Sequence, residues 1–217
     1  MPQVTVLNHP LVDVKMTTLR DAATPAYRFR QTLHEMAALM SAEVFRHLEV
    51  QPVDVTTPLE VTTGAALPPY APCLVSILRA GNGLTDAFLN IFPEAAVGHL
   101  GMERDHDTHQ ARAYYEKLPP AIEKRQVILI DPMLATGGSA VMAAAQLRSR
   151  GVRDIVFTAL VAAPEGVTAF HNAHPDIPVI TAAMDRELND NCYILPGLGD
   201  AGDRIINTQK PNAHQPR

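Results

Sequence analysis

The sequence predicts an α/β protein with a central, mainly parallel sheet flanked by helices. Apolar runs of strand length alternate with helical patterns from residue 73 to residue 183. Such alternation is typical of a parallel sheet that is covered on both faces. The runs are also apolar almost without interruption, as in CLVSIL at 73–78 and QVILI at 126–130, which is the pattern of strands buried on both sides.

The first third of the chain predicts a strand, a long helix and a hairpin. A short strand over 4–7 ends at Asn8-His9-Pro10. Apolar residues recur every three or four positions over 24–48, which indicates an amphipathic helix. Thr24-Pro25 is a typical helix start, with a capping residue before Pro. The β-branched and turn residues over 51–69 indicate a hairpin or irregular strands.

The remaining elements follow the alternation. We expect strands at 73–78, 95–100, 126–130, 154–161 and 179–183, and helices at 84–91, 139–148 and 165–171. Gly151 is a typical residue to close the helix at 139–148. Ligands of such sheets bind beyond the carboxyl ends of the strands. The segments after CLVSIL, AAVGHL and QVILI are therefore the expected ligand-binding loops.

Length and composition favour a single globular domain. The chain has 217 residues, of which 47% are hydrophobic and 19% charged, as is ordinary for such a domain. Its net charge of −5 and its lack of a Lys/Arg run argue against a nucleic-acid-binding face. The start resembles no signal peptide, and no apolar run is long enough to span a bilayer. We therefore expect a cytoplasmic protein with no nucleic-acid or membrane partner.

The cysteines and one histidine pair give little sign of a metal site. Cys73 and Cys192 lie far apart beside apolar residues, without metal-ligand spacing, and we expect both to be buried, reduced thiols. His171 and His174 have a three-residue spacing that occurs in some metal sites. The neighbouring Pro175 favours a helix end instead.

The strongest local signal for a ligand begins at Val127, in VILIDPMLATGGSAVMAAAQL. A buried strand ends at Asp131, and small residues lead to a helix that begins near Ser139. Successive N–H groups over 136–139 can converge on one point as an anion nest. The helix N-terminus adds free N–H groups and its positive dipole end, and the hydroxyls of Thr136 and Ser139 add further donors. The segment therefore suits a phosphate monoester.

The loop differs from a Walker loop, because it lacks both the GxxxxGK[ST] spacing and the Lys. This favours a sugar phosphate over a nucleoside triphosphate. Taken alone, TGGS at 136–139 is as typical of a capped helix start as of a phosphate site. Asp131 favours the phosphate site, because a carboxylate at this strand end can accept hydrogen bonds from sugar hydroxyls.

DPMLATGGS at 131–139 resembles the motif with which phosphoribosyltransferases bind phosphoribosyl pyrophosphate (PRPP). Its Asp-Pro start is similar to that of uracil phosphoribosyltransferases, whereas most other branches carry two adjacent acids. Further segments are similar to that family: HPLV at 9–12, ILRAG at 77–81, LVAAPEG at 160–166 and YILPGLGDAGD at 193–203. The resemblance covers about residues 3–206.

The resemblance implies the type I phosphoribosyltransferase fold with a small hood or β-arm. It implies one domain over 1–206, with a flap or β-arm at about 102–119. A polar tail over 207–217 would follow, and we expect it to be mobile. The arm departs from the family pattern at Glu103, where the family has Tyr.

The implied activity is that of a pentosyltransferase of the glycosyltransferase class. It would transfer the phosphoribosyl group of PRPP to uracil N1, giving UMP and pyrophosphate in pyrimidine salvage. The implied cofactor is Mg²⁺, carried by PRPP without a direct protein ligand and reached by Asp200 through water. The resemblance also implies a homo-oligomer, a dimer or higher, and makes GTP a candidate effector.

Carried over residue by residue, the resemblance assigns three overlapping sets of site residues. The PRPP-binding set is Arg79, Arg104, Asp131, Pro132, Met133, Leu134, Ala135, Thr136, Gly137, Gly138, Ser139 and Asp200. The uracil-binding set is Tyr193, Ile194, Gly199, Asp200 and Ala201. The catalytic set is Arg79, Arg104, Asp131 and Asp200.

Residue chemistry agrees with these roles and leaves simpler alternatives. The planar guanidinium groups of Arg79 and Arg104 suit a pyrophosphate, but Arg79 could form a surface ion pair and Arg104 could lie on a solvated arm. The glycines of PGLGDAGD at 196–203 let backbone groups approach a planar base, but a surface turn has the same composition. A pocket matched to the carbonyls of uracil would reject cytosine by roughly 10⁴-fold.

Two other functions fit part of the pattern. One is a transferase for another base or a bifunctional pyrimidine regulator, against which PGLGDAGD argues. The other is a non-catalytic regulator of transcription that binds PRPP or a nucleotide. The acidic chain and the intact Arg79, Arg104, Asp131 and Asp200 argue against it.

Overall fold

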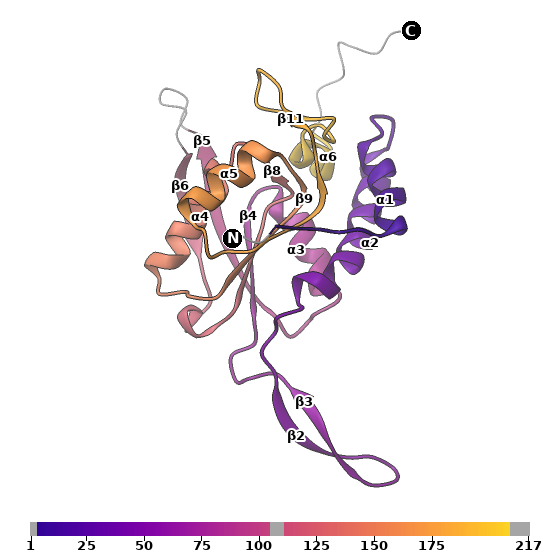
Figure 1. The fold of residues 1–217 in the computed structure, drawn as a ribbon, viewed down its shortest axis with the longest axis vertical. Coiled ribbons are helices and arrows are strands. Elements are labelled where there is room, and N and C mark those ends of the chain that lie inside the picture. Colours follow the sequence, from indigo (N-terminus) through magenta and orange to yellow (C-terminus); the bar gives the residue numbers. More distant parts are fainter. Residues whose placement is uncertain (1–3, 105–110, 209–217) are drawn as a thin grey trace.

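The computed structural model describes residues 4–104 and 111–208. Its centre is one sheet with the strand order β1-β10-β9-β7-β4-β5-β6, to which β8 adds beside β9 (Figure 1). All pairings are parallel except that of β5 with β6. The strands are β1 (Val4–Val6), β4 (Cys73–Leu78), β5 (Ala96–Arg104), β6 (Ala111–Lys117), β7 (Val127–Ile130), β8 (Met133–Leu134), β9 (Ile155–Ala162) and β10 (Val179–Met184).

Helices cover both faces of the sheet. One face carries α1 (Pro10–Arg20), α2 (Ala26–Val44) and α3 (Gly81–Leu89), and the other carries α4 (Gly138–Ser149) and α5 (Pro164–Ala173). A short 3₁₀ helix, η1 (Ile122–Lys124), precedes β7. Among the described residues, no helix combines the length and the apolar character that crossing a membrane would require. The prediction of a mainly parallel sheet flanked by helices is confirmed.

Two small units extend from this body (Figure 1). At one end, β11 (Glu187–Leu188) pairs with β12 (Ile194–Leu195), and α6 (Ala201–Ile206) follows. We call residues 185–206 the hood. At the other end, β2 (Gln51–Thr56) and β3 (Val61–Ala66) form an antiparallel hairpin that projects away from the sheet.

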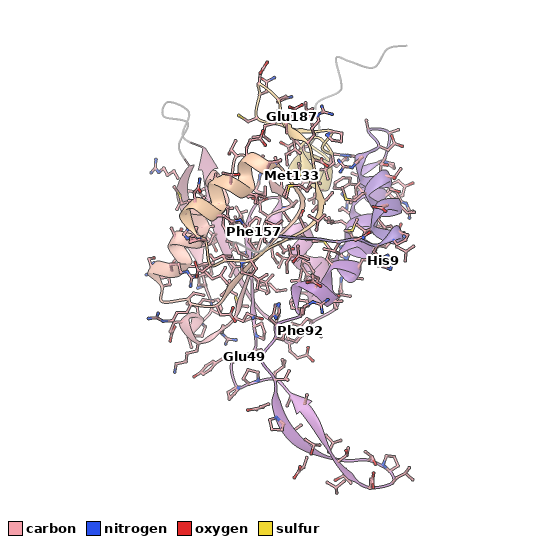
Figure 2. All side chains as sticks on the ribbon, viewed as in Figure 1. His9, Glu49, Phe92, Met133, Phe157 and Glu187 are labelled. Atoms are coloured by element: carbon pink, nitrogen blue, oxygen red, sulfur yellow. The ribbon has the colours of Figure 1, made fainter. Side chains whose placement is uncertain are left out.

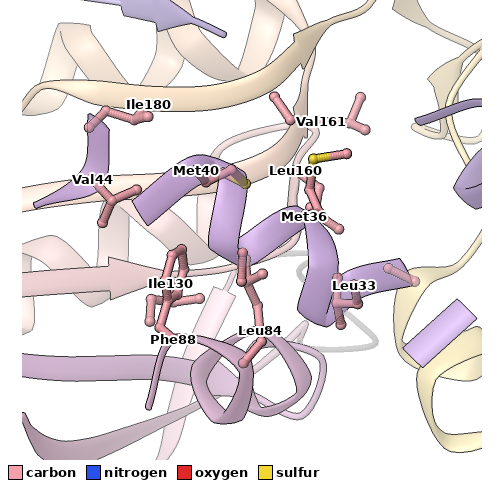
Figure 3. Close-up of a cluster of buried hydrophobic side chains, with 14 of the residues drawn as sticks. Leu33, Met36, Met40, Val44, Leu84, Phe88, Ile130, Leu160, Val161 and Ile180 are labelled. Carbon is pink, nitrogen blue, oxygen red and sulfur yellow. The ribbon is translucent and has the colours of Figure 1, made fainter. Parts of the chain in front are cut away.

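The alternation of side chains along the strands divides the core into two layers. Ile128 and Ile130 of β7 pack with the residues of α1–α3, whereas Val127 and Leu129 pack with those of α4 and α5. This period of two is what a strand buried on both faces requires. Figure 3 shows the first layer, in which α2, α3 and the sheet meet through fully or almost fully buried side chains. The sheet is thus a rigid platform for the loops at its edges.

Several element boundaries differ from the prediction. The helix expected over 24–48 is α2, and it ends at Val44. Thr24 does not cap it, since its hydroxyl donates to the Thr18 carbonyl and Pro25 takes the N-cap position. We did not predict α1, whose first turn is capped by His9 through a hydrogen bond from the Leu11 N–H to Nδ1 (3.1 Å).

The expectation that both cysteines are buried is correct for one of them. Cys73 is buried in β4, and this burial raises the pKa of its thiol to about 12. Cys192 is exposed, because it lies in the turn before β12 with φ +62°. The apolar neighbours of Cys192 did not indicate that the segment turns outward.

The paired histidines are bonded to backbone groups. The Nε2 atom of His171 lies 3.2 Å from the Ile177 carbonyl, and that of His174 lies 3.0 Å from the Val141 carbonyl. Within the described ranges, no three His, Cys, Asp or Glu side chains are placed to share a metal ion.

Candidate active site

A cavity of about 400 Å³ opens where the carboxyl ends of β4 and β7 meet the hood. In the view of Figure 2, Met133 lies below Glu187 of the hood, whereas Phe92 and Glu49 lie toward the end that carries the β2–β3 hairpin. The cavity walls come from three loops far apart in sequence. They are Leu78, Arg79, Ala80, Asp131, Met133, Ala135, Cys192, Tyr193, Ile194, Gly199, Asp200, Ala201 and Gly202.

A second cavity, of about 180 Å³, is formed by the loop between β7 and α4. Its walls are Asp131, Met133, Leu134, Ala135, Thr136, Gly137, Gly138, Ser139 and Ala140. The two cavities adjoin, because Asp131, Met133 and Ala135 line both. One ligand with a phosphate at one end could therefore occupy both.

The start of α4 has the geometry expected of an anion site. Gly137 is the N-cap and takes φ +84°, which a side chain would strain. The helix begins at Gly138, so its first N–H groups have no partner within the helix, and its first three residues line the second cavity. This arrangement, with the hydroxyls of Thr136 and Ser139 on the same cavity wall, favours a phosphate group.

Two glycines outside the predicted site hold its loops in place. A Cβ at Gly166 in α5 would lie 2.3 Å from the Ala135 carbonyl oxygen and 2.6 Å from that of Leu134. A Cβ at Gly81 would lie 2.7 Å from the Ile130 carbonyl oxygen. Backbone thus packs directly on backbone under both loops. In the sequence these positions stood out only as parts of LVAAPEG and ILRAG.

Asp131 connects the two cavities. Its carboxyl accepts a hydrogen bond from the Met133 N–H at 3.4 Å. Burial raises the pKa of this carboxyl to about 7, an effect that the Met133 hydrogen bond only partly opposes. At neutral pH the group can therefore donate or accept a hydrogen bond, as the hydroxyls of a ribose can.

The predicted pyrophosphate residues lie on separate elements. Arg79 directly follows β4, is exposed and lines the larger cavity. Arg104 is the last residue of β5, but its side chain lies outside the described part of the chain, as does that of Glu103. Of the flap predicted over 102–119, the strands of β5 and β6 are described and residues 105–110 are not.

Pro132 is buried and lines neither cavity. Its carbonyl accepts hydrogen bonds from the N–H groups of Leu160 (3.0 Å) and Val161 (3.2 Å) in β9. We call residues 131–139 the phosphate loop. Pro132 therefore fixes the start of this loop to the sheet.

The hood supplies the predicted uracil-binding residues, all of which line the larger cavity: Tyr193, Ile194, Gly199, Asp200 and Ala201. Gly199 takes φ +76°, which exposes backbone groups there. Asp200 also caps α6, since its Oδ1 accepts from the Asp203 N–H at 2.9 Å. The side chains that hold this loop without lining the cavity, Arg20, Asp185 and Arg204, carried no sequence signal, because most of their partners lie far away along the chain.

Known proteins are similar to this chain over nearly its whole length. The family model described as uracil phosphoribosyltransferase matches residues 6–208. A protein of Acidovorax ebreus named uracil phosphoribosyltransferase is 50% identical over 209 residues, which cover 96% of this chain and 100% of the relative. A relative of the same name from Listeria welshimeri is 49% identical with the same coverage.

The chain also superposes on solved structures. The AQ2163 protein of Aquifex aeolicus superposes with a TM-score of 0.87 at 32% identity, covering 94% of this chain and 97% of the other. An adenine phosphoribosyltransferase of Trypanosoma brucei, solved with AMP, pyrophosphate and ribose 5-phosphate, superposes with a TM-score of 0.58 at 10% identity, covering 88% of each chain. The latter likeness concerns the fold alone. The chain belongs to the uracil phosphoribosyltransferase family.

Proposed function

We propose that the chain transfers the phosphoribosyl group of PRPP to uracil, giving UMP and pyrophosphate in pyrimidine salvage. The observation that carries this proposal is the pair of adjoining cavities that share Asp131. One has the donors of a phosphate site and the other is roofed by the glycine-rich hood. PRPP and a base would need such neighbouring sites.

Each part of the substrates has a matching set of groups. The ribose 5-phosphate would take the N–H groups and hydroxyls of 136–139, and Asp131 would bond the ribose hydroxyls. Arg79 would hold the pyrophosphate, with Arg104 as the predicted second clamp. Uracil would lie against the backbone of the hood at 193–201, where its two carbonyls and the N–H between them can be paired.

The reaction exchanges one bond at the anomeric carbon for another. Uracil N1 loses its proton and forms the bond to this carbon, while the carbon–oxygen bond to pyrophosphate breaks and its electrons leave with the pyrophosphate. By analogy with glycosyl transfer, positive charge develops on the ribose in the transition state. Catalysis then rests on positioning and on Arg79 stabilising the leaving pyrophosphate.

The residues of the site fit Mg²⁺ as a cofactor that arrives with PRPP. Asp131 and Asp200 both line the larger cavity, and Mg²⁺ is usually bound by one or two carboxylates together with substrate phosphates and water. The ion would offset the negative charge that the pyrophosphate gains as it leaves. We expect Asp200 to reach it through water.

The direct test is formation of the corresponding nucleoside monophosphate from PRPP, with uracil, cytosine, hypoxanthine and orotate offered separately, with and without Mg²⁺. We expect turnover with uracil alone, and only with Mg²⁺. Turnover with another base would favour the broader transferase. Tight PRPP binding without turnover of any base would favour a non-catalytic regulator.

The raised pKa of Asp131 predicts a pH-dependent effect of Asp131→Asn on stability. Because the folded pKa lies above that of an unfolded aspartate, wild-type stability falls as the pH rises toward about 7. Asn stays neutral and avoids this loss. The melting temperature of the variant relative to wild type should therefore rise between pH 4 and pH 7, on the order of ten degrees, and then level off.

Thermal unfolding of both proteins without substrate, in buffers from pH 4 to pH 8, measures this difference. A constant offset across the range would mean that Asp131 titrates as an ordinary carboxyl. The same variant should lose about tenfold or more in kcat/KM for PRPP, because it loses a charge-assisted hydrogen bond to the ribose.

The capping role of Asp200 makes two substitutions informative. Asn caps a helix as well as Asp, whereas Ala costs about 1 kcal/mol. Asp200→Asn should keep the stability of wild type and lose about tenfold or more in kcat, and Asp200→Ala should lose both. Urea unfolding and steady-state rates separate these effects. If Asp200→Asn kept the wild-type kcat, the role of Asp200 would be limited to capping α6.

We further propose that the chain forms a homo-oligomer, with the β2–β3 hairpin at an interface. The support is the exposure of apolar side chains on this projecting hairpin, among them Val53, Val55, Val61 and Leu59, the last 94% exposed. Sedimentation at micromolar concentration should show a dimer or larger species. A sharp monomer boundary would refute the proposal. Activation by GTP and location in the cytoplasm stay predictions.

A further inference from the structure

An ion pair outside the cavity holds the hood. Arg20, the last residue of α1, donates two hydrogen bonds to the carboxylate of Asp185, from Nη1 to Oδ2 (2.8 Å) and from Nη2 to Oδ1 (2.6 Å). Asp185 directly follows β10 and is 7% exposed. Neither residue lines the larger cavity. Such a bidentate pair fixes both partners in one orientation.

The same two side chains bond both backbone groups of one hood residue, Gly197. The Gly197 N–H donates to Asp185 Oδ2 at 2.9 Å, and the Gly197 carbonyl accepts from Arg20 Nη1 at 2.7 Å. Gly197 takes φ +61°, and a Cβ there would lie 2.2 Å from the Ile194 carbonyl oxygen. The pair therefore fixes a tight turn between Ile194 and Gly199, which both line the cavity.

Two further arginines anchor the hood, and one of them, Arg204, also bonds the turn. The guanidinium of Arg204 donates to the carbonyls of Leu198 (2.8 Å) and Asp21 (2.6 Å). Arg30 donates to the Ile205 carbonyl at 2.8 Å. The α6 end, which carries Asp200, is thus held to α1 and α2 independently. Within the hood, the Arg20–Asp185 pair bonds only the turn, at Gly197.

We propose that Arg20 and Asp185 are positioning residues for the base, because they set the height of the Ile194–Gly199 turn over the cavity. The inference rests on the proposed function, which places uracil against this turn. The phosphate loop is held by β9 and α5 instead. Loosening the ion pair should therefore weaken the binding of uracil and leave the binding of PRPP almost unchanged.

Arg20→Lys tests this role with little change in charge or bulk. Lysine keeps the positive charge and loses the planar fork that reaches both Asp185 and Gly197. We expect the KM for uracil to rise about tenfold, corresponding to one bonded contact. The KM for PRPP should change less than about twofold. Asp185→Asn should shift the KM for uracil in the same direction.

Arg148→Lys is the matched control. Arg148 lies in the last turn of α4, forms an ion pair with Asp176 and donates to the carbonyls of Val152 and Arg153. Like Arg20, it joins an ion pair to hydrogen bonds with backbone carbonyls. It lies at the C-terminal end of α4, roughly 16 Å from the phosphate loop, because a helix rises 1.5 Å per residue. Any loss in this variant should appear in thermal stability, with both KM values unchanged.

The outcomes separate positioning from stability. A rise in the KM for uracil alone, in Arg20→Lys and Asp185→Asn but not in Arg148→Lys, supports the proposal. A loss of melting temperature without a change in the KM for uracil overturns it, and so does an equal rise in both KM values. A wild-type protein that makes no UMP would instead contradict the proposed function.

Discussion

The contact between Gly166 and the carbonyls of Leu134 and Ala135 is the constraint on which the site depends. Only a residue without a Cβ allows α5 to come this close. The approach presses the phosphate loop against the sheet, while Pro132 ties its first residue to β9. The loop can then present its N–H groups and hydroxyls in one arrangement before any ligand binds. Preorganisation of this kind lowers the cost of binding a phosphate.

The hood, which forms the other side of the larger cavity, is also held in one arrangement, but by side chains rather than by close backbone packing. The hood contains two short strands and one short helix, and side-chain hydrogen bonds supply much of what holds it in place. Three arginines hold it: Arg20 of α1 pairs with Asp185, Arg30 of α2 bonds the Ile205 carbonyl, and Arg204 of α6 bonds the Asp21 carbonyl. The cavity thus lies between a loop fixed by close backbone packing and a loop fixed by guanidinium groups, with Asp131 between them.

The sequence predicted most of the layered fold, because its strands are continuous apolar runs and the phosphate loop is a local motif. Thr136–Ser139 can be recognised without knowing what surrounds them. The Arg20–Asp185 pair could not be predicted, since 165 residues separate its partners and nothing in either segment indicates the other. Asp200 was assigned to the ligand alone, because its capping bond appears only once α6 is seen. Cys192 was expected to be buried because of its apolar neighbours. The prediction was wrong, since such neighbours do not distinguish a turn from a strand.

We expect one ligand to span both cavities, with its phosphate at the start of α4 and its base under the hood. A crystal structure with bound UMP measures this directly. The phosphate should lie within hydrogen-bond distance of the N–H groups over 136–139. The ribose hydroxyls should lie at Asp131 and the uracil edge against backbone groups of 194–201. A phosphate bound elsewhere, or a base in contact with solvent rather than the hood, would contradict this expectation.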